Sequence, residues 1–296
     1  MHVARDARAL GHDVVCVSER LPNLASHVLD LGADLVLYMK AGTKRLASAE
    51  TQRFWWMAQG KGAITASYHL DLYVGLPREK EVGVDPFWRT QHVFTADGDP
   101  TTQAIMDHAG INHHWLPAAC VSDETNSGKF DPTLASDVIF VGKTDGYHES
   151  WPWRQKLVDA LKRRYGRNFK VYGHGMGMRD QHLNDLYASA RIVVGDSLCP
   201  PGHANYWSDR YYETIGRGGF LIAPRIPGLE AHFTEGKHFI GYDIGDMPEL
   251  YRTIDHWLDP VRVAERNLIS EQGRIHVRLE HTYKDRVKQM LDTVGL

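Results

Sequence analysis

Polar and charged side chains that could bind a nucleotide gather in the stretch from Asn205 to Glu213. Ser208 begins a predicted helix over 208–216, where its hydroxyl would cap the first turn. The unpaired amides of that turn favour an anion such as a diphosphate, and Arg210 could add charge-assisted hydrogen bonds. Glu213 follows about one turn later, where a carboxylate can accept two hydrogen bonds from a vicinal diol such as a ribose. The alternative is a surface Arg–Glu pair on an amphipathic helix.

Glycines follow three of the strands predicted in the second half of the chain. These positions are Gly142-Lys143, Gly173-His174-Gly175 and Gly195-Asp196. Ligands of open α/β sheets bind outside the carboxyl ends of the strands, and glycine lets a phosphate or a base approach the backbone closely. The alternative is that these glycines form only tight turns. A G-x-G-x-x-G motif after a strand and a Walker lysine pattern are both absent, so neither a dinucleotide nor a P-loop site is indicated.

In the first half, His69 and Asp71 follow a predicted strand. Either one could act as a general base that takes the proton of an acceptor hydroxyl. The alternative is that Asp71 caps a turn and His69 is a surface residue. A second acidic loop, 97–100, is predicted to be a turn and the N-cap of a helix that starts near Thr101.

Strands and helices alternate through the first half. Strands are predicted at 14–18, 35–39, 63–68, 92–95 and 113–116, and helices at 3–10, 24–31, 48–58 and 101–109. This rhythm is typical of a parallel sheet with helices on its faces. No strand is predicted before the first helix, so the opening strand that is usual in such a lobe is apparently missing.

A polar linker over 122–136 separates this half from a second alternating series. Strands are predicted at 138–141, 169–172, 192–194 and 219–223, and helices at 153–165, 182–190, 208–216, 247–258 and 261–294, the last with a break at Gly273. We therefore expect an α/β protein with two Rossmann-like lobes that face a central cleft. The expected domains are 1–121, 137–280, and a C-terminal helix over 281–296 that could pack back on the first lobe.

The composition excludes several classes of protein. The chain has 296 residues, of which 43% are hydrophobic and 24% charged, and its formal net charge is −3. No apolar run approaches the ~20 residues of a membrane span, and the N-terminus lacks the apolar core of a signal peptide. Three scattered cysteines form neither a disulfide framework nor a zinc motif, which favours a cytoplasmic location. The slightly acidic balance gives no strong basic footprint for nucleic acid.

The segment from Glu213 to Ile222 resembles the glutamate-x-x-x-x-glycine-glycine-strand element of GT-B glycosyltransferases. The whole second half, about 137–290, is similar to the spore-maturation-type branch of that superfamily. The supporting stretches are Phe140-Val141-Gly142, Asp209-Arg210-Tyr211-Tyr212-Glu213, Gly228-Leu229-Glu230 with Phe233, and His281-Thr282-Tyr283-Lys284-Asp285-Arg286.

The resemblance implies transfer of a sugar from a nucleotide diphosphate sugar, often a uridine diphosphate sugar, without a metal or another cofactor. Glu213 matches the family glutamate that holds the ribose, and Lys143 stands where many relatives have an arginine that neutralises the diphosphate. The nucleobase would lie at Gly173-His174. The implied donor-binding residues are Gly142, Lys143, Gly173, His174, Asn205, Ser208, Asp209, Arg210 and Glu213.

The sequence departs from this pattern at two positions. Asn205 stands where many retaining relatives have a second glutamate, and His148 stands where they have a lysine. A nucleotide-sugar epimerase of the same architecture and a non-catalytic binding module therefore remain alternatives. The acceptor stays open among a glycan, a protein, a small molecule and a modified DNA base.

Overall fold

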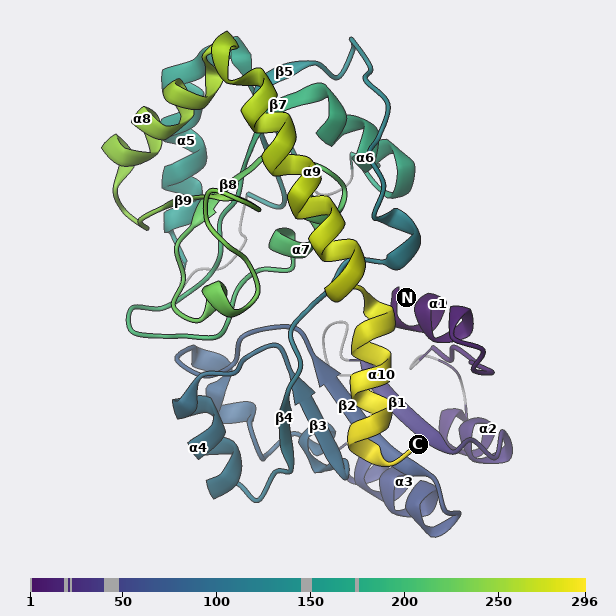
Figure 1. Cartoon of the computed structure of the whole chain (residues 1–296). Helices are drawn as coiled ribbons and strands as arrows, with labels where there is room; N and C mark the ends of the chain where they lie inside the picture. The colour runs from purple at the N-terminus through teal and green to yellow at the C-terminus, as the bar shows by residue number, and fades with distance from the viewer. Residues whose placement is uncertain (1, 19–20, 22, 40–47, 145–150, 174–175) are drawn as a thin grey trace. The chain divides into compact units, whose positions relative to one another are not determined.

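The computed structural model describes residues 2–18, 21, 23–39, 48–144, 151–173 and 176–296. The chain divides into two compact units, each built on one parallel sheet (Figure 1). Unit 1 comprises Met1–Pro117, Gly202–Tyr206 and Arg286–Leu296, and unit 2 comprises Ala118–Pro201 and Trp207–Asp285. None of the helices in the described ranges is long and apolar enough to cross a membrane.

The sheet of unit 1 has four parallel strands in the order β1-β2-β3-β4. Their bounds are β1 Leu35–Met39, β2 Ile64–His69, β3 His92–Thr95 and β4 His113–Trp115. The helices are α1 His2–Ala9, α2 Leu24–Asp30, α3 Ser48–Gly60 and α4 Pro100–His108, with 3-10 turns at Pro77–Glu81 and Pro86–Arg89. The last helix of the chain, α10 (Tyr283–Val294), contributes its residues from Arg286 onward. The predicted alternation is thus confirmed for this half, apart from its first strand.

The strand predicted at 14–18 is wrong. Residues 12–18 form no regular element, and Val15 is 55% exposed. The carbonyl of Val14 accepts hydrogen bonds from the Arg8 guanidinium, at 3.1 Å from Nε, instead of from a neighbouring strand. The β-branched side chains of this run therefore favoured a strand locally, but no sheet buries them.

The sheet of unit 2 has five parallel strands in the order β6-β5-β7-β8-β9. Their bounds are β5 Ser136–Val141, β6 Phe169–Tyr172, β7 Ala190–Val194, β8 Leu221–Pro224 and β9 Ile240–Tyr242. The helices are α5 Trp153–Tyr165, α6 Asp180–Ser189, α7 Arg210–Gly216, α8 Met247–Leu258 and α9 Val263–Glu280. Short 3-10 turns lie at Ser122–Glu124, Gly166–Asn168, Leu229–Ala231 and Pro260–Arg262. β9 was not predicted from the sequence, because it has only three residues.

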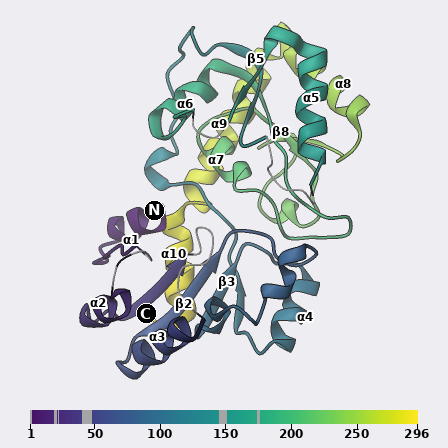
Figure 2. The ribbon, with the colours of Figure 1, turned by 180° about the vertical axis from the view of Figure 1, so that it is seen from behind.

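Side chains alternate across this second sheet. Val138 and Phe140 of β5 point into a core that includes Leu157 of α5 and Ile254 of α8, and all four are fully buried. Ile139, between the first two, is also fully buried and faces the other side of the sheet. Figure 2 shows the helices of unit 2 on both sides of its sheet. Burial on both faces explains the continuous apolar runs of these strands.

The break predicted at Gly273 is wrong, because α9 runs without interruption from Val263 to Glu280. A Cβ at Gly273 would lie 2.6 Å from Ile215 Cγ2 and 2.9 Å from the carbonyl oxygen of His238. Gly273 therefore serves close packing of α9 on α7, and the helix ends seven residues later.

Candidate donor site

The strand order of unit 2 points to the carboxyl ends of β5 and β7. β5 pairs with β6 on one side and with β7 on the other, so the chain reverses its direction of winding at this place in the sheet. Open α/β sheets bind ligands at such a switch point, outside the carboxyl ends of the strands. The described residues that follow β5 and β7 here are Gly142 to Thr144 and Gly195 onward.

Gly142 and Arg210, two of the predicted donor-binding residues, lie against each other at this switch point. Arg210 Nε donates to the carbonyl oxygen of Val141 at 2.6 Å. A Cβ at Gly142, whose φ is +146°, would lie 2.5 Å from Arg210 Nη2. The positive φ favours glycine at this position, and the guanidinium that crosses the end of β5 lies directly against it.

Glu213 lies one turn after Arg210 on α7 and is half-buried. Its carboxylate makes no hydrogen bond or ion pair with any residue that the structure describes. Burial, and then the charge of Asp209, raise the pKa of Glu213 to about 7, although Arg217 and Arg210 oppose the shift. A carboxylate that is partly withdrawn from water and lacks a protein partner is poised to accept hydrogen bonds from a ligand.

The start of α7 differs from the prediction. The helix begins at Arg210, so Asp209 and not Ser208 occupies the N-cap position, and the Asp209 side chain makes no capping bond. Ser208 Oγ still accepts from the Arg210 backbone amide at 3.3 Å and from Arg210 Nη1 at 3.3 Å. With seven residues, α7 has a small dipole, and the local charge comes mainly from Arg210.

For the other predicted donor-binding residues, the structure shows fewer contacts. Lys143 is exposed directly after Gly142, and its carbonyl oxygen accepts from Arg154 Nη1 at 3.3 Å. The Gly173 amide lies 3.2 Å from the sulfur of Met176. His174 and His148 fall outside the described residues.

A buried ion pair supports the end of β7, and the sequence analysis did not find it. Arg154 Nε donates to Asp196 Oδ2 at 2.8 Å, and both side chains are at most 1% exposed. Trp151 Nε1 donates to the same carboxylate at 3.1 Å. Asp196 therefore has a structural partner on α5. The only available signal was its position after a strand-ending glycine.

Asn205, predicted to bind the donor, lies in the segment 202–206 that belongs to unit 1. It has a left-handed backbone, with φ of 54°, and its Nδ2 donates to the carbonyl oxygen of Gly98 at 3.3 Å. Asp99 is the N-cap of α4, as predicted, and accepts from the Thr101 amide at 2.7 Å. The turn and its cap are thereby confirmed.

His203 of the same segment was missed by the sequence analysis. Its Nε2 lies 2.8 Å from Asp97 Oδ1, and its Nδ1 lies 3.8 Å from Asp99 Oδ2. Burial alone would lower the pKa of His203, but the hydrogen bond to Asp97 and the charges of both aspartates raise it. The imidazole therefore fixes segment 202–206 on unit 1.

The two residues predicted as acceptor-side bases differ in exposure. His69 is 1% exposed and stacks on Trp88 at 4.2 Å between ring centroids, so the alternative that it is a surface residue is wrong. Asp71 is exposed, with Arg78 Nη1 at 3.8 Å from its Oδ2. Of the two, Asp71 is the one that a substrate can reach.

Among the described residues, two groups consist of side chains of the kinds that can bind a metal ion. His276, Glu280 and His281 of unit 2 offer ligand atoms within 4.8 Å of one another, but His276 Nε2 already lies 2.6 Å from the carbonyl oxygen of His232. In unit 1, Asp97 and Asp99 have the D-x-D spacing. Every oxygen of these two carboxylates has a partner within unit 1, so this pair is used for structure.

Comparison with known proteins agrees with this geometry. Residues 154–292 match the family described as glycosyl transferase-like. This segment contains Arg210 and Glu213. No curated protein matches the chain.

Solved structures resemble the chain over nearly its whole length. A glycosyltransferase from Rickettsia africae ESF-5 is 13% identical with a TM-score of 0.62, and the match covers 99% of this chain and 92% of that one. Anabaena Alr3699/HepE in complex with UDP-glucose is 11% identical with a TM-score of 0.59, covering 93% and 84%. Sucrose-phosphate synthase from Thermosynechococcus elongatus is 13% identical with a TM-score of 0.58, covering 91% and 75%.

At these identities the structural likeness establishes the fold, and the family match establishes the type of domain in unit 2. Both agree with the resemblance carried by the segment from Glu213 to Ile222. The chain therefore has the fold of GT-B glycosyltransferases, and its segment 154–292 matches the glycosyl transferase-like family.

Proposed function

We propose that this protein is a glycosyltransferase that moves a sugar from a uridine diphosphate sugar to a hydroxyl group of its acceptor, and that unit 2 holds the donor. The observation that carries the proposal is the half-buried Glu213 carboxylate, which has no hydrogen-bond or ion-pair partner among the described residues and lies one turn after Arg210. Such a carboxylate can accept both hydroxyl hydrogens of a ribose.

The positive charge needed by a diphosphate is present at the same strand end. Arg210 crosses Gly142, and Lys143 follows directly as an exposed cation. Two cations near a departing diphosphate stabilise the charge that develops in the transition state. We propose that they take this role without a metal ion.

The uridine preference is supported by structures of similar fold. Anabaena Alr3699/HepE is described in complex with UDP and with UDP-glucose. A trehalose-6-phosphate protein from E. coli, which is 11% identical with a TM-score of 0.61, is described as bound with UDP-2-fluoro glucose. The match covers 92% of this chain and 76% of that one.

On the acceptor side we propose Asp71 as the general base. Its carboxylate is 70% exposed, whereas His69 is closed in by Trp88 and Tyr73. Removal of a general base typically lowers the rate by about 10²–10⁴-fold. Asp71→Asn should therefore lower kcat by that factor while UDP affinity stays unchanged. An unchanged kcat would remove Asp71 from the mechanism.

A UDP-release assay with UDP-glucose, UDP-galactose and UDP-N-acetylglucosamine tests the function. We expect slow release without an acceptor and faster release with the right one. The sugar left in the donor pool is analysed in the same tubes. Conversion of one UDP-sugar into another without release would identify an epimerase. Neither reaction with any of the three donors would contradict the proposed reaction.

A further inference from the structure

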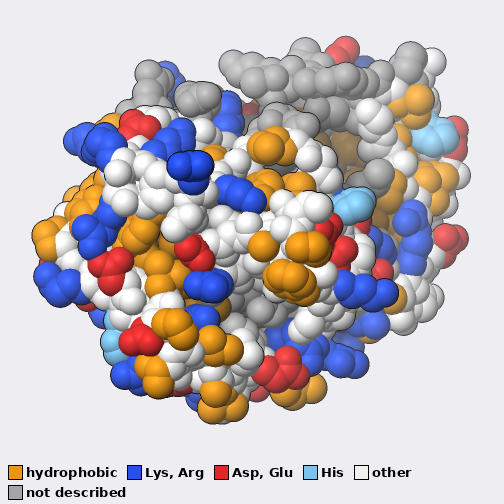
Figure 3. Space-filling model, turned by 90° about the horizontal axis from the view of Figure 1, so that it is seen from above, with side chains coloured by type: hydrophobic (Ala, Val, Ile, Leu, Met, Phe, Trp, Pro, Cys, Tyr) orange, Lys and Arg blue, Asp and Glu red, His pale blue; other side chains and the backbone are white. Residues whose placement is uncertain are grey.

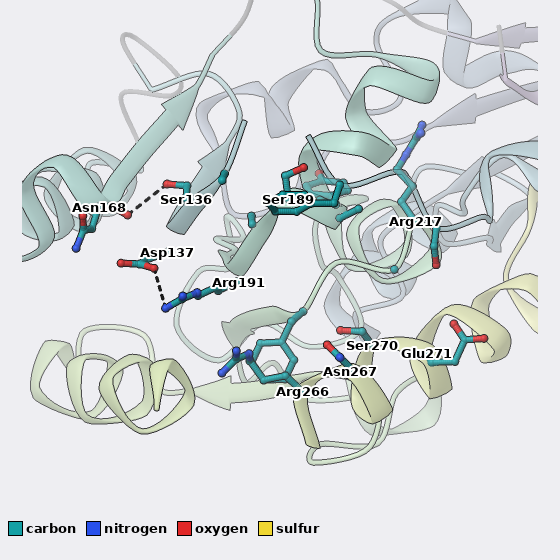
Figure 4. A pocket seen from close by; sticks show the side chains of 18 of the residues that line it. Ser136, Asp137, Asn168, Ser189, Arg191, Arg217, Arg266, Asn267, Ser270 and Glu271 are labelled. Atoms are coloured by element: carbon teal, nitrogen blue, oxygen red, sulfur yellow. Dashed lines mark hydrogen bonds and ion pairs between the residues drawn. The ribbon is translucent and has the colours of Figure 1, made fainter. Parts of the chain in front are cut away.

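A cavity of about 750 Å³ lies in unit 2 at the amino ends of β5 and β7 (Figure 4). Its lining includes Ser136 and Ala190, the first residues of these two strands. The candidate donor site lies at the carboxyl ends of the same strands, so the cavity is at the opposite edge of the sheet. Its volume is in the range of small-molecule pockets.

The lining of this cavity is more basic than acidic. Four arginines, Arg167, Arg191, Arg217 and Arg266, line it together with two acidic residues, Asp137 and Glu271. Asp137 pairs with Arg191 at 3.1 Å, Glu271 with Arg274, and Arg217 with Glu124. Arg167 and Arg266 are left without a carboxylate partner among the residues that the structure describes.

Arg266 differs from the other three arginines because it is buried, at 6% exposed, and also lacks a carboxylate partner among the described residues. Its Nη1 donates to the carbonyl oxygens of Trp257 and Asp259, the latter at 3.4 Å. Nε and Nη2 bond to no described residue. A buried guanidinium without a counter-charge is costly unless a ligand supplies one.

Arg191 is close enough to Arg266 for their charges to repel. Burial, and then the charge of Arg191, lower the pKa of Arg266. Figure 4 shows both side chains extending toward the same side of the cavity, with Asp137 beside Arg191. Two guanidinium groups that face one space form a fork for an oxyanion.

We propose that this cavity binds a phosphate group, held by Arg191 and Arg266, at a site separate from the nucleotide site. Ser270 and Asn267 also line the cavity, and their side chains make no hydrogen bond with the described residues. The cavity is much larger than one phosphate, so free phosphate and a phosphorylated small molecule with hydroxyl groups are the two sources to be distinguished.

Calorimetric titration of the full chain with inorganic phosphate tests the proposal. We expect one site, and Arg191→Ala should weaken it by about tenfold or more, because charge-assisted hydrogen bonds are lost. Arg266→Lys, which keeps the charge but loses the fork, should also weaken it. Asp137→Asn should strengthen binding several-fold, because it releases Arg191 from its ion pair. The matched control is Arg163→Ala, since Arg163 is exposed on α5 and does not line the cavity.

Two further arms complete the test. Saturation with UDP should leave the phosphate affinity unchanged, whereas competition would place the phosphate in the donor site and overturn the proposal. Glucose 6-phosphate that binds at least tenfold more tightly than inorganic phosphate would identify a phosphate ester as the source, and equal affinities would identify free phosphate. The proposal is also overturned if wild type binds neither at millimolar concentration, or if Arg191→Ala and Arg163→Ala bind alike.

Discussion

At the residue scale, the half-buried Glu213 lies near the carboxylate of Asp209 and near the guanidinium groups of Arg210 and Arg217. Burial and Asp209 raise its pKa to about 7, so near neutral pH the carboxyl is divided between its two protonation states. The ionised form accepts strong hydrogen bonds from both hydroxyls of a diol, one on each oxygen, whereas protonation turns one of these oxygens into a donor. Binding of a ribose should therefore depend on pH in the range where most carboxylates do not titrate.

Uridine is the best probe of this dependence because it lacks the phosphates that titrate in UDP. We expect its affinity to fall about tenfold from pH 8 to pH 6, since Glu213 takes up a proton on passing its pKa of about 7. Glu213→Gln should bind weakly and equally at both values. Titration followed by intrinsic fluorescence measures the effect, and a flat profile for wild type would contradict the role of Glu213.

Gly142 and Arg210 were each named from the sequence by their type and position. The structure brings Gly142, after β5, against Arg210, the first residue of α7. His203 gave no such signal, because its partners Asp97 and Asp99 lie more than a hundred positions away and meet it only through the fold.

At the scale of elements, the charge of His203 holds the segment 202–206 against the rest of unit 1. The pKa of His203 is raised in the folded state, so its stabilising contribution is fully present below the unfolded value of 6.5. The contribution is lost as the pH rises through the folded-state pKa. Both Asp97 and Asp99 face this imidazole within unit 1.

His203→Gln should therefore lower the melting temperature more at pH 5.5 than at pH 8.5. The loss at the lower pH should correspond to about 1–3 kcal/mol of unfolding free energy, as for a hydrogen bond to a charged group. Thermal unfolding at the two pH values measures it. His27→Gln, at an exposed position of unit 1, is the control and should change neither value. Equal losses of melting temperature at both pH values would contradict a stabilising charge on His203.

The close contact of α9 with α7 gives a second prediction at this scale. Gly273→Ala should destabilise the chain by about 1–3 kcal/mol, because the added methyl would meet Ile215 and the His238 carbonyl. Gly60→Ala on α3, where a Cβ meets nothing within 4 Å, should be neutral or stabilising. Chemical denaturation measures both. Similar effects of the two substitutions would show that α9 does not need a glycine here.

Element boundaries were predictable where hydrophobic pattern and burial agree. Leu35–Met39, Trp153–Tyr165 and Met247–Leu258 lie where the sequence placed them. The errors at 14–18 and at Gly273 share one cause. Local propensity favours a strand or a break there, but the presence or absence of a packing partner decides the outcome.

At the scale of the whole molecule, two parallel sheets were predictable from the alternation of strands and helices. The order β6-β5-β7-β8-β9 was not, because pairing between strands leaves no mark in the sequence. This order creates the switch point at β5 and β7, and it also places the arginine-lined cavity at the opposite edge of the sheet.

Side chains of both charges are mixed on one face of the molecule (Figure 3). On the face in Figure 3, Lys and Arg side chains are interspersed with acidic and apolar ones. With a net charge of −3, we expect the attraction of a diphosphate to come from local cations, such as Arg210 and Lys143 near the end of β5. Salt should therefore weaken diphosphate binding without abolishing it.

Calorimetric titration with UDP of wild type, Glu213→Ala and the surface control Glu265→Ala tests the central claim most directly. We predict one site in wild type, unchanged affinity in Glu265→Ala, and a loss of about 1–3 kcal/mol of binding free energy in Glu213→Ala, because two hydrogen bonds to the ribose are removed. UDP binding that is equally strong in all three proteins, or absent from wild type at millimolar concentration, would contradict the account.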